Sequence, residues 1–389
     1  MGLPPLPVFN VSTAVALSVF GDAALYTILP SYYPHIGLIP FQVGMILSIN
    51  RWIRLASNHM AERFCRRYPS DFWLIFALFA GSVATAIYGV AYTFVIFLGA
   101  RILWGVSYSF IRQISIIIAA KSGPEYHLGE RMGYYRGISA MWISCGIFFA
   151  GISHGYFGFT FTLVTLSILS LGALPLGALS QRGVKIMAEN SPRPLSGKGD
   201  YRIRLLGFAN GVVGPGMIMS TIGFILKEQV GEFFEVAGFS ISVVTMTGTF
   251  LGLRWILMGI GAPVLGNVAD RLGRRLFIYV GFMVGALDLL ITGIYLRPIL
   301  LIFCLLIFFL CEITLYPLLT ALASQYGTRE VASFVTAVDF GMASGPLIGW
   351  SIGQAGIHAK YILIVGGIIY VFCAIISFNM WLSHKNIRT

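Results

Sequence analysis

Apolar segments long enough to cross a lipid bilayer recur along the whole chain. A helix needs about 20 residues to span a hydrocarbon core of about 30 Å, and polar or Pro/Gly punctuation divides the sequence into twelve such segments. Hydrophobic residues make up 57% of the chain and charged residues 11%, which is too little polar surface to cover a soluble globule. The sequence therefore predicts an all-α membrane protein with spans at residues 11–33, 39–57, 72–92, 96–120, 131–153, 158–180, 203–226, 237–261, 276–296, 299–323, 331–354 and 361–383.

The distribution of Lys and Arg predicts how these spans are oriented. Cytoplasmic loops retain positive charge, and with both termini inside, seventeen of the 26 basic residues are cytoplasmic, three are outside and six lie within spans. Basic loops facing anionic inner-leaflet lipid account for the net charge of +11, so we expect lipid contacts and no nucleic-acid partner. The expected location is a bacterial inner membrane.

A polar, basic stretch separates the first six spans from the last six. Residues 181–202 combine Arg and Lys with two prolines and a cluster of small polar residues. We expect an N-terminal six-helix half at 1–180, a cytoplasmic linker at 181–202 and a C-terminal six-helix half at 203–389.

One charged motif occurs twice, 208 residues apart, each time after an apolar segment and before the next. The later copy contains Gly266, Asp270, Arg271, Gly273, Arg274 and Arg275. The earlier copy runs from Asn58 to Arg67 and keeps an acid and arginines at the same spacing, as Glu62, Arg63 and Arg67. A charged loop that is repeated in an apolar chain indicates a duplicated membrane protein.

Six plus six spans, the basic linker and the repeated motif resemble the major facilitator superfamily over essentially the whole chain. The resemblance implies two halves that rock about a midplane site, with spans 1, 4, 7 and 10 lining the cavity, in a protein that works as a monomer. It also implies that the motif is a conformational latch, whereas the plain alternative is a positive-inside anchor. The earlier copy departs from the family pattern at Asn58, Glu62 and Cys65, so the two latches are expected to be unequal.

Ten ionisable side chains lie inside the predicted spans, where each costs about 2.5–3.5 kcal/mol at a helix centre on insertion scales. They are expected to face the protein interior or a wet cavity. The six cations outnumber the four anions, which favours an anionic or carboxylate-bearing solute. The ten residues are Asp22, Arg51, Arg54, Arg101, Arg112, Arg136, Arg254, Asp288, Glu312 and Asp339.

Three of these residues are candidates for coupling transport to protons. Asp22 and Glu312 lie about midway through spans 1 and 10, at a depth that suits a site exposed alternately to each side. Arg101 and Gly105, four residues apart, resemble the Arg-x-x-x-Gly motif that the family's proton-driven antiporters carry in span 4. The alternative for Asp22 is a permanent ion pair with Arg101 or Arg112.

Further polar and aromatic residues of the cavity-lining spans, together with arginines of the equivalent spans 2 and 8, are candidates for binding solute. Arginine binds carboxylates and oxyanions through a planar fork that stays charged. Arg51 or Arg54 could instead neutralise Asp339 on span 11, and this alternative stays open. The solute-binding candidates are Arg112, Arg51, Arg54, Arg254, Asn210, Tyr26, Tyr108 and Trp104.

Taken together, the residues predict a secondary active transporter that moves a small organic solute in exchange for, or together with, protons. No phosphate-binding loop, metal-ligand spacing or nucleophile arrangement occurs, so we expect no cofactor, no metal and no enzymatic activity. Export of an anionic or amphipathic solute is favoured slightly over uptake of an organic or inorganic anion by symport. A receptor that no longer transports is the alternative from another class. The small-residue run from Gly341 to Gly349 predicts close helix packing in span 11.

Overall fold

The computed structural model describes residues 4–67, 70–91, 93–123, 127–184, 199–236, 239–295 and 297–388. The chain forms two compact units. Unit 1 comprises Met1–Leu38, Ile49–Ser191 and Val244–Trp255, and unit 2 comprises Ile39–Ser48, Pro192–Val243 and Ile256–Thr389. These units do not test the expected boundaries of the two halves, which stay a prediction.

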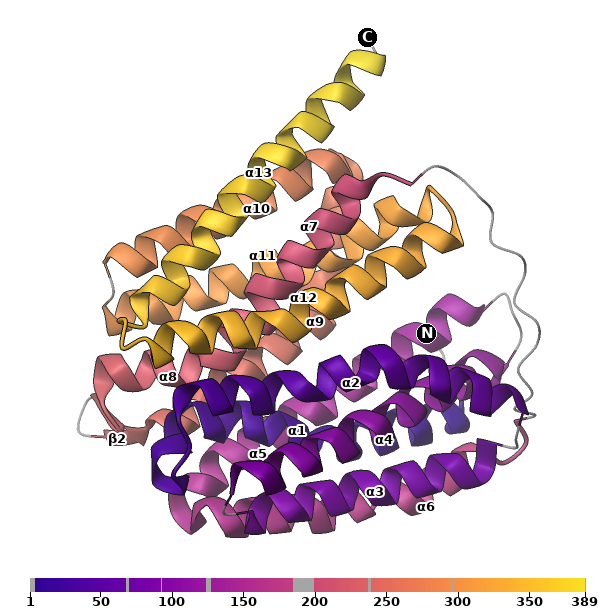
Figure 1. Ribbon diagram of the computed structural model, residues 1–389. Coiled ribbons are helices and arrows are strands. Elements are labelled where there is room, and N and C mark those ends of the chain that lie inside the picture. Colours follow the sequence, from indigo (N-terminus) through magenta and orange to yellow (C-terminus); the bar gives the residue numbers. More distant parts are fainter. Residues whose placement is uncertain are drawn as a thin grey trace. The chain divides into compact units, whose positions relative to one another are not determined.

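Unit 1 consists of helices packed around the first span, drawn from indigo to magenta in Figure 1. Its elements are α1 (Leu6–Tyr32), η1 (Tyr33–Ile36), most of α2 (Pro40–Arg67), α3 (Ser70–Val90), α4 (Phe94–Lys121), α5 (Leu128–Leu171) and α6 (Ala173–Ser180). Helix α1 packs along α5 and also contacts α3, α4 and α6. It is the most buried candidate span of this unit, so polar side chains on α1 face protein instead of lipid.

Unit 2 is built around an interrupted helix. Its elements are α7 (Tyr201–Gly211), the π-helix η3 (Val212–Ile218), α8 (Met219–Val230), strands β1 (Phe233–Val236) and β2 (Phe239–Ser242), most of α9 (Val243–Leu272), α10 (Arg274–Ile294), α11 (Pro298–Ser324), α12 (Thr328–Gln354) and α13 (Lys360–Arg388). The strands pair antiparallel, with Phe233 opposite Ser242. Pro215 lies inside η3 and lacks the amide hydrogen that a regular helix needs, which accounts for the local widening.

The helices account for the twelve predicted spans. Ten helical segments in the described part of the chain are long and apolar enough to cross a membrane. The 53-residue segment Leu128–Ser180 covers two predicted spans, because the chain bends at Gly158, whose φ of 80° is left-handed. The remaining span is α2, which is less apolar because it carries Arg51 and Arg54. The prediction of an all-α protein with twelve membrane helices is confirmed.

The repeated motif is helical over most of its length, so the expectation of two loops was wrong. Helix α9 continues to Leu272 and is broken only at Gly273, which has a φ of 103°, before α10 begins. The earlier copy carries Cys65 at the equivalent position, and α2 continues through it to Arg67. A side chain disfavours the left-handed conformation that Gly273 adopts, so the exchange of glycine for cysteine explains the difference between the two helix ends.

Small residues bring α12 into backbone contact with the interrupted helix of unit 2. A Cβ atom on Gly345 would lie 2.3 Å from the carbonyl oxygen of Val212, and one on Gly341 would lie 2.2 Å from that of Phe208. These neighbours are backbone atoms, which cannot turn aside as a side chain can. The close packing predicted for this run is confirmed, and lipid-embedded helices depend on such contacts because burial from lipid gives little hydrophobic gain.

We expect Gly345→Ala to destabilise the protein by about 1–3 kcal/mol, the usual cost of overpacking. The measurement is the thermal unfolding midpoint in detergent. Gly99→Ala is the matched control, because a Cβ there would meet nothing within 4 Å and alanine is the better helix former. Equal midpoints for the two variants would contradict the packing argument.

Candidate functional site

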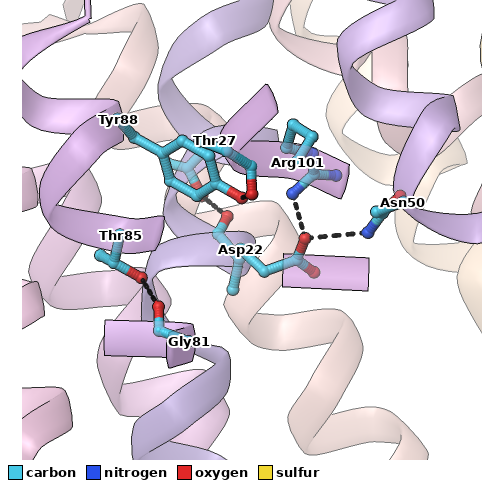
Figure 2. Close-up of polar contacts among 9 residues, drawn as sticks. Asp22, Thr27, Asn50, Gly81, Thr85, Tyr88 and Arg101 are labelled. Carbon is cyan, nitrogen blue, oxygen red and sulfur yellow. Dashed lines mark hydrogen bonds and ion pairs between the residues drawn. The ribbon is translucent and has the colours of Figure 1, made fainter. Parts of the chain in front are cut away.

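An ion pair between a fully buried arginine and a partly buried aspartate joins two helices of unit 1. The guanidinium of Arg101, on α4, donates through Nη1 to Oδ1 of Asp22 on α1, and its side chain is fully buried. Asn50, on α2, donates from Nδ2 to the same oxygen over 3.2 Å. Figure 2 shows the two donors converging on one carboxylate. The alternative partner considered for Asp22 was Arg112, and the structure places Arg101 there.

Tyrosine rings lie close to two arginines of this unit, Arg101 and Arg51. The Cζ atom of Arg101 lies 5.9 Å from the ring centroids of both Tyr26 and Tyr88. Arg51 lies 5.6 Å from the Tyr26 centroid on the same measure. A ring face attracts a cation through its quadrupole, and the attraction grows when water is excluded. Tyr26 therefore contacts two guanidinium groups at once.

A further arginine lies over a tyrosine ring near the middle of α4. The Cζ atom of Arg54 is 4.9 Å from the Tyr108 centroid, and the Tyr108 and Trp104 rings are 5.5 Å apart. Tyr108 is partly exposed, whereas Trp104 is 1% exposed and packs against Gly81. Of these two solute-binding candidates, only Tyr108 presents surface to a ligand in this structure.

Gly105 sets the distance between α2 and α4. A Cβ atom at this position would lie 2.8 Å from the carbonyl oxygen of Asn50 and 3.1 Å from its Cα. The missing side chain lets the backbone of α2 approach α4, which is what brings Asn50 to Asp22. The arginine and glycine of the Arg101-x-x-x-Gly105 motif thus act together: one binds the carboxylate, and the other admits the helix that carries its second donor.

Unit 2 contains a buried acid of its own. Glu312, on α11, is 3% exposed and lies against Gly214 in η3, where a Cβ atom would come within 2.3 Å of the Glu312 Cγ. The glycine makes room for the acid at the point where the helix widens. Pro317 lies inside α11 five residues later. The acid therefore packs against a π-helix, an interruption that is frequent at functional sites.

The other solute-binding candidates occupy different environments. Asn210, on α7, is buried and accepts a hydrogen bond of 2.7 Å from the hydroxyl of Tyr370 on α13. Arg254, on α9, is 6% exposed, and Arg112, on α4, is partly exposed. Within the described residues, no group of three or more His, Cys, Asp or Glu side chains could hold a metal ion.

The latch residues are only partly described. Arg63 and Arg271 are exposed and Glu62 is partly exposed, whereas Arg275 donates through Nη1 to the carbonyl oxygen of Met380 on α13, 3.3 Å away. Arg274 is partly exposed at the first position of α10. The side chains of Arg67 and Asp270, and the surroundings of Gly266, lie outside the described residues, so the latch stays a prediction.

Three residues that contact the candidates were missed by reasoning from the sequence: Asn50, Tyr88 and Tyr370. The polar residues predicted from the spans were charged side chains and Asn210, although Asn50 stands directly beside Arg51. An uncharged amide in the middle of a span would have been a signal for it. Tyr88 and Tyr370 are two among 18 tyrosines, and nothing in their sequence neighbourhood distinguishes them.

Known proteins show where this architecture belongs. The chain shares its fold with the nucleoside transporter NupG, at 9% identity over 96% of this chain and 99% of that one, with a TM-score of 0.80. A bacterial homolog of the human lysosomal transporter Spinster, in an inward-facing conformation, matches at 11% identity over 97% of each chain with a TM-score of 0.75. The human organic anion transporter MFSD10 matches at 14% identity over 96% of this chain and all of that one, with a TM-score of 0.64.

No curated protein matches the chain by sequence. The family model of the Major Facilitator Superfamily, in contrast, matches residues 11–339, which is most of the sequence and includes eleven of the twelve predicted spans in whole or in part. This match agrees with the resemblance carried by the repeated motif. It also agrees with the fold that the structure adopts. The chain belongs to the Major Facilitator Superfamily.

Proposed function

We propose that this protein is a secondary active transporter of a small organic solute, anionic or amphipathic, and that protons drive it through Asp22 and Arg101. The observation that carries the proposal is the buried pair of these two residues, with Asn50 as the second donor to the same carboxylate oxygen. The family supports transport as the activity. The solute, the coupling ion and the direction are the proposed parts.

The pair supports coupling because neither partner can change its charge alone at low cost. Arg101 is fully buried and its guanidinium does not deprotonate. Leaving one partner of a buried pair uncompensated costs about 3–5 kcal/mol. Protonation of Asp22 is therefore linked to any event that gives Arg101 another anion, and a solute carboxylate or phosphate arriving at Arg101 is such an event.

Asn50 is suited to both protonation states of Asp22. Its Nδ2 donates to the carboxylate, while its Oδ1 is buried and has no hydrogen-bond partner among the described residues. An amide carries donors and an acceptor on one group, so rotation would let Oδ1 accept from a protonated carboxyl. A buried acceptor without a partner is costly, and a proton or solute donor arriving here would satisfy it.

The charges around the pair favour an anionic solute. Arg51, Arg54 and Arg112 join Arg101 in unit 1. Arg51 lies over the buried ring of Tyr26, and Arg54 lies over the partly exposed ring of Tyr108. Tyr108 offers ring surface beside Arg54, which suits a solute with an apolar or aromatic part, whereas Tyr26 is 2% exposed and presents none in this structure. Glu312 is proposed as a second protonation site, in unit 2.

For the transport cycle we propose that halves 1–180 and 203–389 rock about the site, joined by a linker at 181–202. Both termini are placed in the cytoplasm, and the location is the inner membrane of a bacterium. Proton-driven export is favoured, and uptake of an anion together with protons is the alternative. A receptor without flux is a further alternative, because the earlier copy of the motif departs from the family pattern.

We expect Asp22→Asn in proteoliposomes to abolish solute flux driven by a pH gradient while retaining exchange of labelled for unlabelled solute. Exchange needs alternating access but no net proton movement, so it separates coupling from folding. Asp288→Asn is the matched control, since Asp288 is a buried acid on α10 and has no place in the proposed mechanism. Loss of both activities in Asp22→Asn, or intact gradient-driven flux, would contradict the coupling role.

The class of solute can be tested by screening ligands for thermal stabilisation of the purified protein. We expect organic anions to raise the unfolding midpoint, and Arg112→Ala and Arg254→Ala to lose that response because a cation that holds the ligand is missing. Cationic ligands whose effect disappears only in Asp22 or Glu312 variants would overturn an anionic solute. Stabilisation without any flux in proteoliposomes would favour the receptor.

The two copies of the repeated motif should contribute unequally to transport. We expect the transport rate of Asp270→Asn to be lower than that of Glu62→Gln by about fivefold or more. A factor of about five is the lower end of typical couplings between two sites. The reason is that only the later copy has the glycine turn at Gly273, where α9 ends and α10 begins. Transport rates are compared at equal amounts of reconstituted protein, after the thermal unfolding midpoints of the two variants have been shown to agree. Equal rates in the two variants would contradict unequal latches.

A further inference from the structure

An open groove of about 800 Å³ lies in unit 2, lined by residues of α7 and of the N-terminal half of α12. It lies at the start of both helices, on the side predicted to be cytoplasmic, and involves none of the residues proposed for coupling or solute binding. Two arginines, Arg204 and Arg329, line it together with Tyr201, Phe208 and Phe340. Its volume is within the range of small-molecule sites.

The cations of the groove exceed the nearby anions that they could pair with. Arg204 pairs through Nε with Oε1 of Glu330 over 3.3 Å, and the Glu330 side chain is 7% exposed. Arg329 is exposed, and the structure shows no ion pair or hydrogen bond for its side chain within the described residues. One guanidinium is thus compensated and the other is available to a ligand. The helix starts themselves carry acids: the Asp200 carboxylate caps α7 by accepting from the amide of Arg202, and Glu330 lies in the first turn of α12. Among the described residues that line the groove, the free cation is therefore the Arg329 side chain.

Most of the other side chains that line the groove are apolar or aromatic. The rings of Phe208 and Phe340 lie 5.8 Å apart at an interplanar angle of 31°, and Phe340 is 43% exposed. Tyr201 is 65% exposed at the first position of α7. The hydroxyl of Thr336 donates to the carbonyl of Ala332, which leaves its oxygen able to accept from a ligand. The lining of the groove therefore combines ring surface with an exposed guanidinium.

We propose that this groove is a second binding site, for a free organic anion that carries an aromatic or extended apolar group beside a carboxylate, sulfonate or phosphate. The acidic group binds Arg329, because a guanidinium fork suits planar and tetrahedral oxyanions. It also binds Arg204 when it displaces Glu330 from that arginine. The apolar part packs on Phe208 and Phe340. This site goes beyond the proposed coupling mechanism, since its binding requires neither Asp22 nor solute flux.

The test is titration calorimetry of the full protein in nanodiscs of neutral phosphatidylcholine, with 2-naphthalenesulfonate as the probe and 2-naphthalenemethanol as its uncharged counterpart. We expect the uncharged probe to bind at least about tenfold more weakly, which corresponds to about 1.4 kcal/mol. Arg329→Gln should weaken sulfonate binding by a similar factor. Arg202→Gln is the matched control, because it also removes one arginine charge from the first turn of a helix, here α7, and Arg202 does not line the groove.

A gain in affinity provides evidence that misfolding cannot imitate. Glu330→Gln removes the anion that occupies Arg204, so we expect it to tighten sulfonate binding by several-fold, and Phe340→Ala to weaken both probes. Binding should be unchanged in Asp22→Asn, which keeps this result separate from any failure of the coupling mechanism. Equal loss in Arg202→Gln and Arg329→Gln, or weaker binding in Glu330→Gln, would overturn the site.

An anionic lipid headgroup has similar chemistry, and a second set of nanodiscs separates the two sources. Phosphatidylglycerol is added to the bilayer and the titration is repeated with the unmodified protein and with Arg329→Gln. If the occupant is a free organic anion, the negatively charged bilayer should lower the affinity for the sulfonate probe only slightly. The decrease should be the same in the unmodified protein and in Arg329→Gln. Loss of probe binding in the unmodified protein through competition at Arg329 would assign the groove to lipid and overturn the proposal.

Discussion

The bilayer offers no water to a polar group, and this constraint shapes both units. Backbone amides are satisfied within helices, and a charged side chain must find its partner inside the protein. Arg101 is the most demanding case, because it is fully buried and keeps its charge. The placement of Asp22, Asn50 and Gly105 around it follows from that demand: an anion to pair with, a second donor to hold the anion, and a gap through which α2 can approach.

Glycine serves the same constraint in unit 2 by a different route. Helices surrounded by lipid gain little from the hydrophobic effect when they associate, so close contact has to supply the attraction. Gly341 and Gly345 place the backbone of α12 directly on α7 and η3. Gly214 instead opens space in the π-helix for the Glu312 side chain. Missing side chains thus produce tight packing at one face of the interrupted helix and room for a buried acid at another.

Reasoning from the sequence was strongest where the pattern is long and the physics is simple. Twelve apolar segments of membrane length predicted the spans, and the helices confirm them even where α5 covers two spans and α2 is unusually polar. It was weakest at helix ends. The charged motif was expected to form loops because charge interrupts the apolar pattern, yet alanine, glutamate and arginine are good helix formers, and α2 and α9 continue through it. Gly273 alone has the conformation that breaks the helix.

The sequence by itself determined the class of this protein: its hydropathy, its charge asymmetry and its repeated motif require a membrane protein of two related sets of spans. It also identified which side chains are too costly to face lipid. Only the tertiary structure decided which partner each of them takes. Asp22 could have paired with either Arg101 or Arg112. Both arginines lie on the same face of α4, so helical periodicity alone does not show which of them Asp22 contacts. The choice depends on how closely α1, α2 and α4 approach, and that is set by contacts such as Gly105 against Asn50, which no single helix encodes.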